Sequence, residues 1–400
     1  MKLIKGNLTM QTLRSHKIRI YPSNTQGTHL MRACGIKRFV YNWGLAERKK
    51  LYEKGEKISG FNLKKNFNSI KKDSYSFVTE VSKCVSDNAL LDLDRAYSNF
   101  FRELKKGNKK SYPKFKKKGV KDSFRIDNDK VTIKENAIRI PKLGYVRMSE
   151  NLRFTGKIMS VTVSKKANRW FVSISVAVEL STETQGDNKC GIDLGIKNLM
   201  VTSNGEVYGN PNEWKRDLQR VQRLSKSLSR KQKKSKNFRK SKDRLANYWL
   251  KLTDKRNDAL HKMTSEISTN YSVVVLEDLK VTELMGNKRL ARKIQNSMFR
   301  EIRRQLEYKT EVIVINQFFP STQLCPSCGR KNKLELNERV YKCKCGYGPV
   351  DRDLHAAQNI LRAGCPEVKP VKAASDSACA AAAVEAGNTH NFRQVRREPL

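Results

Sequence analysis

Four cysteines close together in the sequence are the clearest candidates for chemistry. Cys325 and Cys328 are separated by two residues, and Cys343 and Cys345 form a second, tighter pair that begins fifteen residues after Cys328. Two such pairs are the layout of a zinc ribbon, in which four thiolates fill the tetrahedral shell of Zn²⁺ and leave no open position for catalysis. A redox-active pair is the alternative, but it would not need a second pair. We therefore predict a structural Zn²⁺ at these four cysteines.

Three acidic residues occupy positions at which burying a charged carboxylate would be energetically unfavourable. Asp193 lies inside the apolar segment 191–195 and Glu277 ends the apolar run VVVL, settings in which a carboxylate is usually paired or bound to a metal. Asp353 opens the predicted helix in DRDLHAAQNIL. Each has an ordinary explanation when taken alone, because the dipole of a helix favours acids at its N-terminus and strand-end Glu is commonly a polar edge residue.

Together, the three carboxylates predict a site for a hard cation. Mg²⁺ prefers oxygen ligands from one or two carboxylates and completes its shell with water and phosphate, and Mn²⁺ is an alternative. Two such ions about 3.5 to 4 Å apart could activate water and stabilise the leaving 3′ oxygen in phosphodiester hydrolysis.

A basic and aromatic stretch, KKGNKKSYPKFKKKG, occupies residues 105–119. A solvated tether is one interpretation. The other is nucleic-acid binding, because aromatic rings stack on bases while ammonium groups follow the phosphates. The candidate residues are Tyr112, Lys114, Phe115, Lys116, Lys117 and Lys118.

The charge of the chain requires a polyanionic partner. Its 400 residues contain 82 Lys and Arg against 39 Asp and Glu, a net charge of +43. An ordinary metabolic enzyme is therefore disfavoured, and nucleic acid is the expected partner. An anionic membrane is the weaker interpretation, because the sequence lacks both an apolar run of about 18 residues and the apolar stretch of a signal peptide. We expect a cytoplasmic protein, and the odd number of mostly scattered cysteines argues against a disulfide framework.

The elements of the N-terminal half are predicted to form a small sheet or barrel with helices beside or within it. Residues 13–21 alternate as a strand, Ser23 and Gln26 fit a capping box that begins a helix, and a second helix covers 78–104. Segments 123–148 and 158–180 read as strands, the latter a hairpin turning at residues 167–168.

The elements of the second half are predicted to form an α/β layer. A polar linker at 181–189 precedes a hairpin at 190–209 that turns at Asn204 and Gly205. A long basic helical pair covers 213–270, and two buried strands at 271–279 and 311–316 flank a helix at about 290–308. From Cys365 onward the sequence lacks periodicity and is predicted to be disordered.

The order of GIDLG, VVVLEDL, the four cysteines and DRDLHAAQNIL resembles the RuvC-like nuclease half of the TnpB proteins, which are transposon-encoded RNA-guided DNA endonucleases related to the compact type V CRISPR effectors. The likeness extends upstream through RFVYNWGLAERKKLYEKG, LDRAYSNFFRELKKG and RIPKLGYVRM, and covers roughly residues 13–364.

The resemblance implies an RNase H-like fold whose catalytic acids are Asp193, Glu277 and Asp353. Asp193 would bridge both metal ions. For the third acid, the register of the motif favours Asp353 over Asp351. His355 stands where the family usually has Asn, which bears on metal affinity or pH dependence if that position bonds near the metal.

The predicted fold is an α/β RNase H-like (RuvC-like) nuclease domain with an inserted zinc ribbon, together with an N-terminal β-barrel-like wedge domain that carries a helical recognition insertion. The predicted boundaries are 1–30 and 105–182 for the wedge, 31–104 for the recognition helices, 190–320 and 346–364 for the nuclease, 321–345 for the ribbon and 365–400 for the tail.

The predicted function is RNA-guided, Mg²⁺-dependent cleavage of double-stranded DNA beside a short target-adjacent motif. The protein would be encoded by a mobile element and would act in a prokaryotic-type, nucleoid-associated setting. The guide RNA would come from the element's end, with one or two protein copies on each RNA. Delegating specificity to RNA explains the many basic residues, because the protein then needs mainly backbone contacts. A catalytically silent RNA-guided repressor is the alternative, disfavoured because all three acids are present, and a DNA-strand transferase is a third interpretation.

Overall fold

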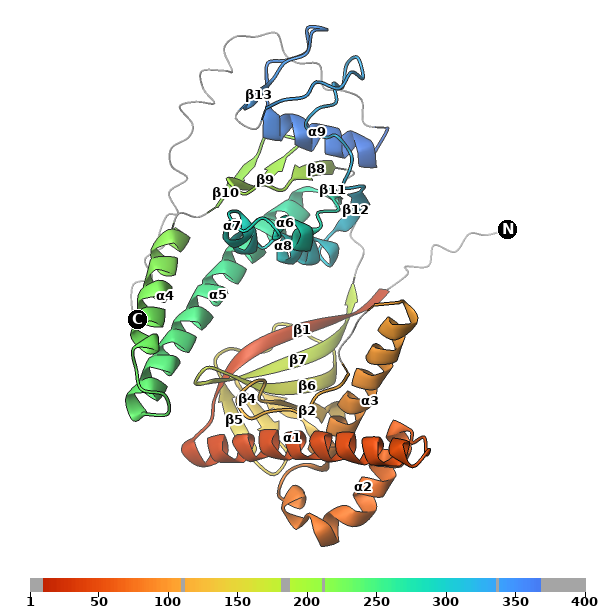
Figure 1. The fold of residues 1–400 in the computed structure, drawn as a ribbon, viewed down its shortest axis with the longest axis vertical. Helices are drawn as coiled ribbons and strands as arrows, with labels where there is room; N and C mark the ends of the chain where they lie inside the picture. The colour runs from red at the N-terminus through yellow and green to blue at the C-terminus, as the bar shows by residue number, and fades with distance from the viewer. Residues whose placement is uncertain (1–9, 109–111, 181–187, 211–212, 336–337, 368–400) are drawn as a thin grey trace, which may run out of the picture. The chain divides into compact units, whose positions relative to one another are not determined.

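The computed structural model describes residues 10–108, 112–180, 188–210, 213–335 and 338–367. The chain divides into two compact units, one of residues 1–183 with 217–253 and the other of residues 184–216 with 254–400, and each is described by itself (Figure 1). The predicted linker at 181–189 falls mostly outside the described residues, and the domain boundaries given above remain predictions.

The first unit is built on one antiparallel sheet of seven strands in the order β2-β6-β7-β1-β5-β4-β3. The strands are β1 (Met10–Tyr21), β2 (Ser123–Asp127), β3 (Thr132–Lys134), β4 (Ala137–Ile140), β5 (Gly144–Met148), β6 (Lys157–Lys166) and β7 (Arg169–Leu180). The predicted hairpin at 158–180 is confirmed, and Ala167 takes a positive φ of 50° in its turn. Within the described residues no pairing joins β2 to β3, so the hydrogen bonding does not close the sheet into a barrel.

Three helices pack with this sheet: α1 (Asn24–Glu53), α2 (Gly60–Ser74) and α3 (Lys83–Lys105). The predicted capping box is confirmed, because the backbone N–H of Gln26 donates to Ser23 Oγ over 3.3 Å and that of Ser23 donates to Gln26 Oε1 over 3.0 Å. The sequence analysis missed α2, although Leu63, Phe67 and Ile70 recur in it at helical spacing. A short 3₁₀ turn at Ser76–Glu80 precedes α3.

The second unit contains a mixed sheet of five strands in the order β10-β9-β8-β11-β12. The strands are β8 (Lys189–Asp193), β9 (Asn198–Thr202), β10 (Val207–Gly209), β11 (Val273–Glu277) and β12 (Glu311–Ile315). Strand β11 pairs in parallel with both β8 and β12, whereas β9 pairs antiparallel with β8 and β10. The predicted α/β layer and its turn at Asn204 and Gly205 are confirmed.

Helices cover both faces of this sheet (Figure 1). The helices of the chain's second half are α4 (Glu213–Ser229), α5 (Lys236–Asn270), α6 (Val281–Leu284), α7 (Ala291–Ser297), α8 (Phe299–Glu307) and α9 (Arg352–Gly364). Val274 and Leu276 pack with α5, α7 and α8 on one face, and Val275 packs with α9 on the other, as alternation along a strand requires. The single helix predicted at 290–308 is two helices, because Met298 takes a left-handed conformation between α7 and α8.

A small cysteine-containing lobe lies in the sequence between β12 and α9 and carries the antiparallel pair β13 (Val340–Tyr341) and β14 (Val350–Asp351). Helix α9 ends at Gly364, and Cys365 is buried in the core beside it. The rest of the predicted disordered tail, from residue 368, lies outside the described residues. None of the helices among the described residues is long and apolar enough to cross a membrane.

Candidate active site and zinc site

Two of the three predicted acids end adjacent parallel strands. Leu276 of β11 lies opposite Ile192 of β8, so the next residue of each strand, Glu277 and Asp193, comes at the same edge of the sheet. The carboxyl ends of parallel strands are where open α/β sheets bind ligands. Both side chains are partly buried there.

Helix α9 brings the third acid to this edge. It packs so closely on β8 that a Cβ at position 191 would come within 2.2 Å of the carbonyl oxygen of Ala357. Asp351 caps the helix, because its carboxylate accepts the backbone N–H groups of Asp353 at 2.9 Å and Leu354 at 3.1 Å. Asp353 is partly buried, and one of its oxygens lies 3.8 Å from the guanidinium of Arg339.

The carboxylates interact electrostatically. Burial, with smaller contributions from the charges of Glu277 and Asp353, raises the pKa of Asp193 from 3.8 to about 7. Burial also raises the pKa of Glu277, opposed by a hydrogen bond that Ser321 Oγ donates to its Oε1 over 2.5 Å. Such shifted carboxyl groups at the end of a sheet are typical of sites that bind cations or perform acid–base chemistry.

A cavity of about 410 Å³ opens beside Glu277. Three arginines of α8 line it at positions i, i+3 and i+4, a spacing that places them on one helix face and that the sequence analysis overlooked. Arg303 pairs with Asp278 and Glu307, and Arg304 pairs with Glu301. Within the described part of the chain Arg300, the third of these arginines, forms no ion pair and is exposed.

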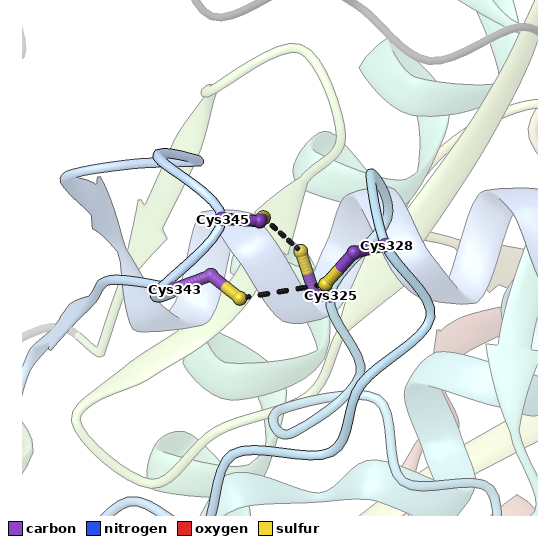
Figure 2. A group of neighbouring side chains, drawn as sticks. All are labelled: Cys325, Cys328, Cys343 and Cys345. Carbon is purple, nitrogen blue, oxygen red and sulfur yellow. Dashed lines mark hydrogen bonds between the residues drawn. The ribbon is translucent and has the colours of Figure 1, made fainter.

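The four predicted zinc ligands come together. Their Sγ atoms all lie within 4.8 Å of one another, with 3.6 Å between Cys325 and Cys345 and 3.6 Å between Cys328 and Cys343 (Figure 2). A tetrahedral Zn²⁺ with Zn–S bonds near 2.3 Å separates its sulfur ligands by about 3.8 Å. The cluster therefore fits a zinc site. Among the described residues no other group of His, Cys, Asp or Glu is gathered this closely, so the three acids lie farther apart than the thiols.

His355 packs against the cysteine lobe. It is fully buried and stacks on Tyr341 of the cysteine lobe, with ring centroids 3.8 Å apart and planes 15° from parallel. Its Nε2 lies 3.1 Å from Asn359 Nδ2, and burial lowers its pKa to about 4. The ring of His355 therefore faces the cysteine lobe, and the effect of this residue on metal binding remains a prediction.

The predicted nucleic-acid-binding stretch is anchored to the helices, which argues against a free tether. The hydroxyl groups of Tyr112 and Tyr97 lie 2.5 Å apart, and both backbone groups of Lys116 bond to the side-chain amide of Asn42. Lys116 also places its ammonium 3.8 Å from the ring centre of Tyr41, and burial lowers its pKa to about 8. The remaining candidates, Lys114, Phe115, Lys117 and Lys118, are exposed.

The chain is similar to known protein families and to named proteins. Residues 171–288 match a family model described as "Probable transposase", and residues 299–360 match one described as "Cas12f1-like, TNB domain". A protein of Streptomyces pristinaespiralis named "Putative RNA-guided DNA endonuclease" is 34% identical over 89% of this chain and 90% of its own length. The chain belongs to the TnpB family. The predicted resemblance is thereby confirmed.

Other relatives agree with this TnpB assignment. A protein of Escherichia coli (strain K12) named "Putative RNA-guided DNA endonuclease InsQ" is 31% identical over 89% of this chain and 93% of its own. The Cas12f1 chain in a complex with guide RNA and target DNA has a similar fold, with a TM-score of 0.51, 14% identity, and coverage of 88% of the TnpB chain and 99% of its own. The fold of the chain is therefore similar to that of the Cas12f1 chain.

One matched description does not fit the TnpB structure. Residues 10–57 match a model described as "Helix-turn-helix domain". The same residues form strand β1 and the single uninterrupted helix α1. The match therefore indicates kinship of sequence and not two helices joined by a turn.

Proposed function

We propose that this TnpB-family nuclease is an RNA-guided endonuclease that cleaves double-stranded DNA with Mg²⁺ ions held by Asp193, Glu277 and Asp353. The observation that carries the proposal is the meeting of two strand-end acids and one helix-start acid at a single edge of the mixed sheet. Relatives named as RNA-guided DNA endonucleases, similar over nearly their whole length, supply the reaction class.

The donor set suits Mg²⁺, with Mn²⁺ as a substitute, because all three side chains offer carboxylate oxygens. A divalent cation supplies charge neutralisation, activation of water and stabilisation of the leaving 3′ oxygen. The raised pKa of Asp193, which burial and the two other acids cause, supports Asp193 as one of the ligands. The capping role of Asp351 supports Asp353 as the third ligand, because Asp351 Oδ1 already accepts two backbone N–H groups and Asp351 is exposed, whereas Asp353 is partly buried.

The cavity beside Glu277 is suited to the phosphodiester backbone. Arg300 has no ionic partner among the described residues, so its guanidinium is available to a phosphate oxygen next to the carboxylates. Arg303 and Arg304 also line this cavity, but both are paired with acids. Arg303 pairs with Asp278 and Glu307, and Arg304 pairs with Glu301.

The partners we propose are a guide RNA transcribed from the end of a transposable element and the target DNA, recognised beside a short adjacent motif. A net charge of +43 suits a protein that holds a long RNA mainly by its phosphates. In this assignment the first unit is the wedge and recognition part, and its exposed Phe115 stacks on a base. Zn²⁺ on the four cysteines keeps the lobe folded and takes no part in hydrolysis.

The decisive experiment compares variants of the two neighbouring aspartates. The purified protein–RNA complex is given matching DNA and Mg²⁺. We expect Asp193→Ala and Asp353→Ala to reduce cleavage at least about a hundredfold, as loss of charge stabilisation does. Asp351→Ala removes the helix cap at a cost of about 1 kcal/mol and should still cleave.

Equal cleavage by Asp193→Ala and the unaltered complex would contradict the metal assignment. Binding of matched DNA without nicking at any Mg²⁺ concentration would establish the silent repressor instead. Integrated products in the same reaction would establish the strand transferase, which the family description "Probable transposase" favours.

A further inference from the structure

Ser321 is the residue outside the acidic triad that touches it most directly. Its side chain donates a hydrogen bond to Glu277 Oε1 over 2.5 Å, and the residue is only 6% exposed. A buried hydroxyl held against one carboxylate oxygen fixes the rotation of the carboxyl group and leaves Oε2 for another ligand. The hydrogen bond also favours the ionised form of Glu277, which burial disfavours.

The backbone of Ser321 is itself fixed by helix α9. Asn359, which is 2% exposed, donates from Nδ2 to the carbonyl oxygen of Ser321 over 2.7 Å and to that of Leu324 over 2.8 Å. These two bonds use both amide hydrogens. Arg362 donates to Asn359 Oδ1 over 3.2 Å, which supports this orientation of the amide.

The same segment leads directly into the zinc site. Leu324 precedes Cys325, whose backbone N–H donates to the carbonyl oxygen of Arg330. Tyr341, which is fully buried in the cysteine lobe, donates its hydroxyl to the carbonyl oxygen of Gln323 and stacks on His355 of α9. Residues 321–325 are therefore held between α9 and the lobe.

We propose that Ser321 is a positioning residue that orients Glu277 for metal binding, and that Asn359 and the cysteine lobe together hold Ser321 in place. The inference rests on the proposed role of Glu277 as a metal ligand. In this proposal the cysteine lobe also affects the candidate active site. Folding of the lobe around zinc would be needed to orient the carboxylate of Glu277, about fifty residues earlier in the sequence.

The test uses the full protein–RNA complex and three single variants. Ser321→Ala removes the donor, Ser321→Thr keeps it, and Thr322→Ala removes the neighbouring half-buried hydroxyl as a matched control. Cleavage is measured against Mg²⁺ concentration. Mn²⁺ binding is measured separately by electron paramagnetic resonance. The Mn²⁺ bound by a Glu277→Gln complex is subtracted from that bound by each complex, because this removes the ions that the RNA binds.

We expect Ser321→Ala to need about tenfold more Mg²⁺ for half-maximal cleavage and to lose Mn²⁺ affinity to the same degree, since a hydrogen bond to a charged group contributes about that factor. Cleavage at saturating Mg²⁺ should approach that of the unaltered complex. Ser321→Thr should restore metal affinity and Thr322→Ala should leave it unchanged.

A fourth variant tests the link to α9. Asn359→Ala should weaken metal binding in the unaltered background, but should add little to Ser321→Ala, because both act through the same hydrogen bond to Glu277. Additive losses in the double variant would overturn this link. Melting temperatures of all variants separate these effects from general unfolding.

Unchanged Mg²⁺ dependence and unchanged Mn²⁺ affinity in a folded Ser321→Ala complex would overturn the positioning role. Failure of the proposed endonuclease function would give a distinct result. The unaltered complex would then not cut DNA at any Mg²⁺ concentration, while Mn²⁺ binding would still report whether Ser321 supports a metal ligand at Glu277.

Discussion

At the scale of single residues, Asp193 carries a charge that its surroundings disfavour. Burial of its carboxyl group, with smaller contributions from the charges of Glu277 and Asp353, raises its pKa from 3.8 to about 7. Without a divalent cation, the folded protein therefore holds a proton at this position that the unfolded chain releases between about pH 4 and 7. By linkage, the contribution of Asp193 to stability is greatest below pH 4 and is lost as the pH rises through 7.

Removing this charge should stabilise the protein in the absence of Mg²⁺. We expect Asp193→Asn to raise the free energy of unfolding at pH 8 by on the order of 2–4 kcal/mol, with the difference disappearing toward pH 4. Melting curves of both proteins in Mg²⁺-free buffer that retains Zn²⁺ would measure it. Added Mg²⁺ should reduce the difference in stability between the two proteins, because it binds the unaltered site only. A variant less stable than the unaltered protein at pH 8 would contradict the burial of this charge.

Residue-level predictions were possible where a side chain conflicted with its local pattern. Asp193 and Glu277 are recognisable in the sequence as acids within apolar strands, and the spacing of the four cysteines predicts that they cluster. Ser321 carries no such signal, because a serine after a proline is an ordinary loop residue until the fold places it against Glu277. The direction in which His355 faces was equally hidden, since it depends on how the lobe packs on α9.

At the scale of elements, the zinc lobe has very little apolar interior of its own. Among its described residues the buried core consists of Cys325, Tyr341 and Cys343, and the strand pairing is limited to β13 with β14 and one isolated bridge between Leu324 and Lys331. Lobes this small commonly need a bound metal to fold. The elements predicted most accurately had strong local signals, such as the capping box at Ser23, whereas the break at Met298 depends on packing around α8.

Loss of zinc should therefore unfold the lobe and reduce cleavage. We expect a Cys325→Ser complex, or one treated with a chelator and then resupplied with Mg²⁺ alone, to lose most of its activity while the first unit stays folded. Zinc content by atomic absorption, limited proteolysis of the lobe and DNA cleavage would be measured together. Returning Zn²⁺ should rescue the chelated protein but not the variant. Full cleavage by a zinc-free preparation would contradict the prediction.

At the scale of the whole molecule, the charge is concentrated and not evenly spread. Residues 215–244 contain 14 Lys or Arg against two Asp, and the stretch 105–118 contains eight Lys without an acid. Composition alone predicted a polyanionic partner. The structure adds that lysines in one basic stretch differ, because Lys116 rests on Tyr41 whereas Lys117 and Lys118 are exposed.

This difference predicts how salt affects RNA affinity. We expect affinity to fall at least about 10³-fold between 50 and 200 mM salt, as for proteins with many phosphate contacts. Replacing both Lys117 and Lys118 by Gln should reduce the slope of log affinity against log salt by about 2, roughly one for each lost contact. Lys116→Gln is the matched control and should lower the melting temperature with little change in slope. Filter binding across a salt series would distinguish the three proteins.

Gly191 is a position at which the packing of α9 on β8 leaves no room for a side chain. A methyl group there would lie 2.2 Å from one backbone atom of α9 and 2.5 Å from another, and neither can rotate away. Any glycine codon becomes an alanine codon by one nucleotide change, so a single replication error can produce this substitution. One substitution at Gly191 should therefore inactivate this nuclease while Asp193, Glu277 and Asp353 in its reading frame remain intact.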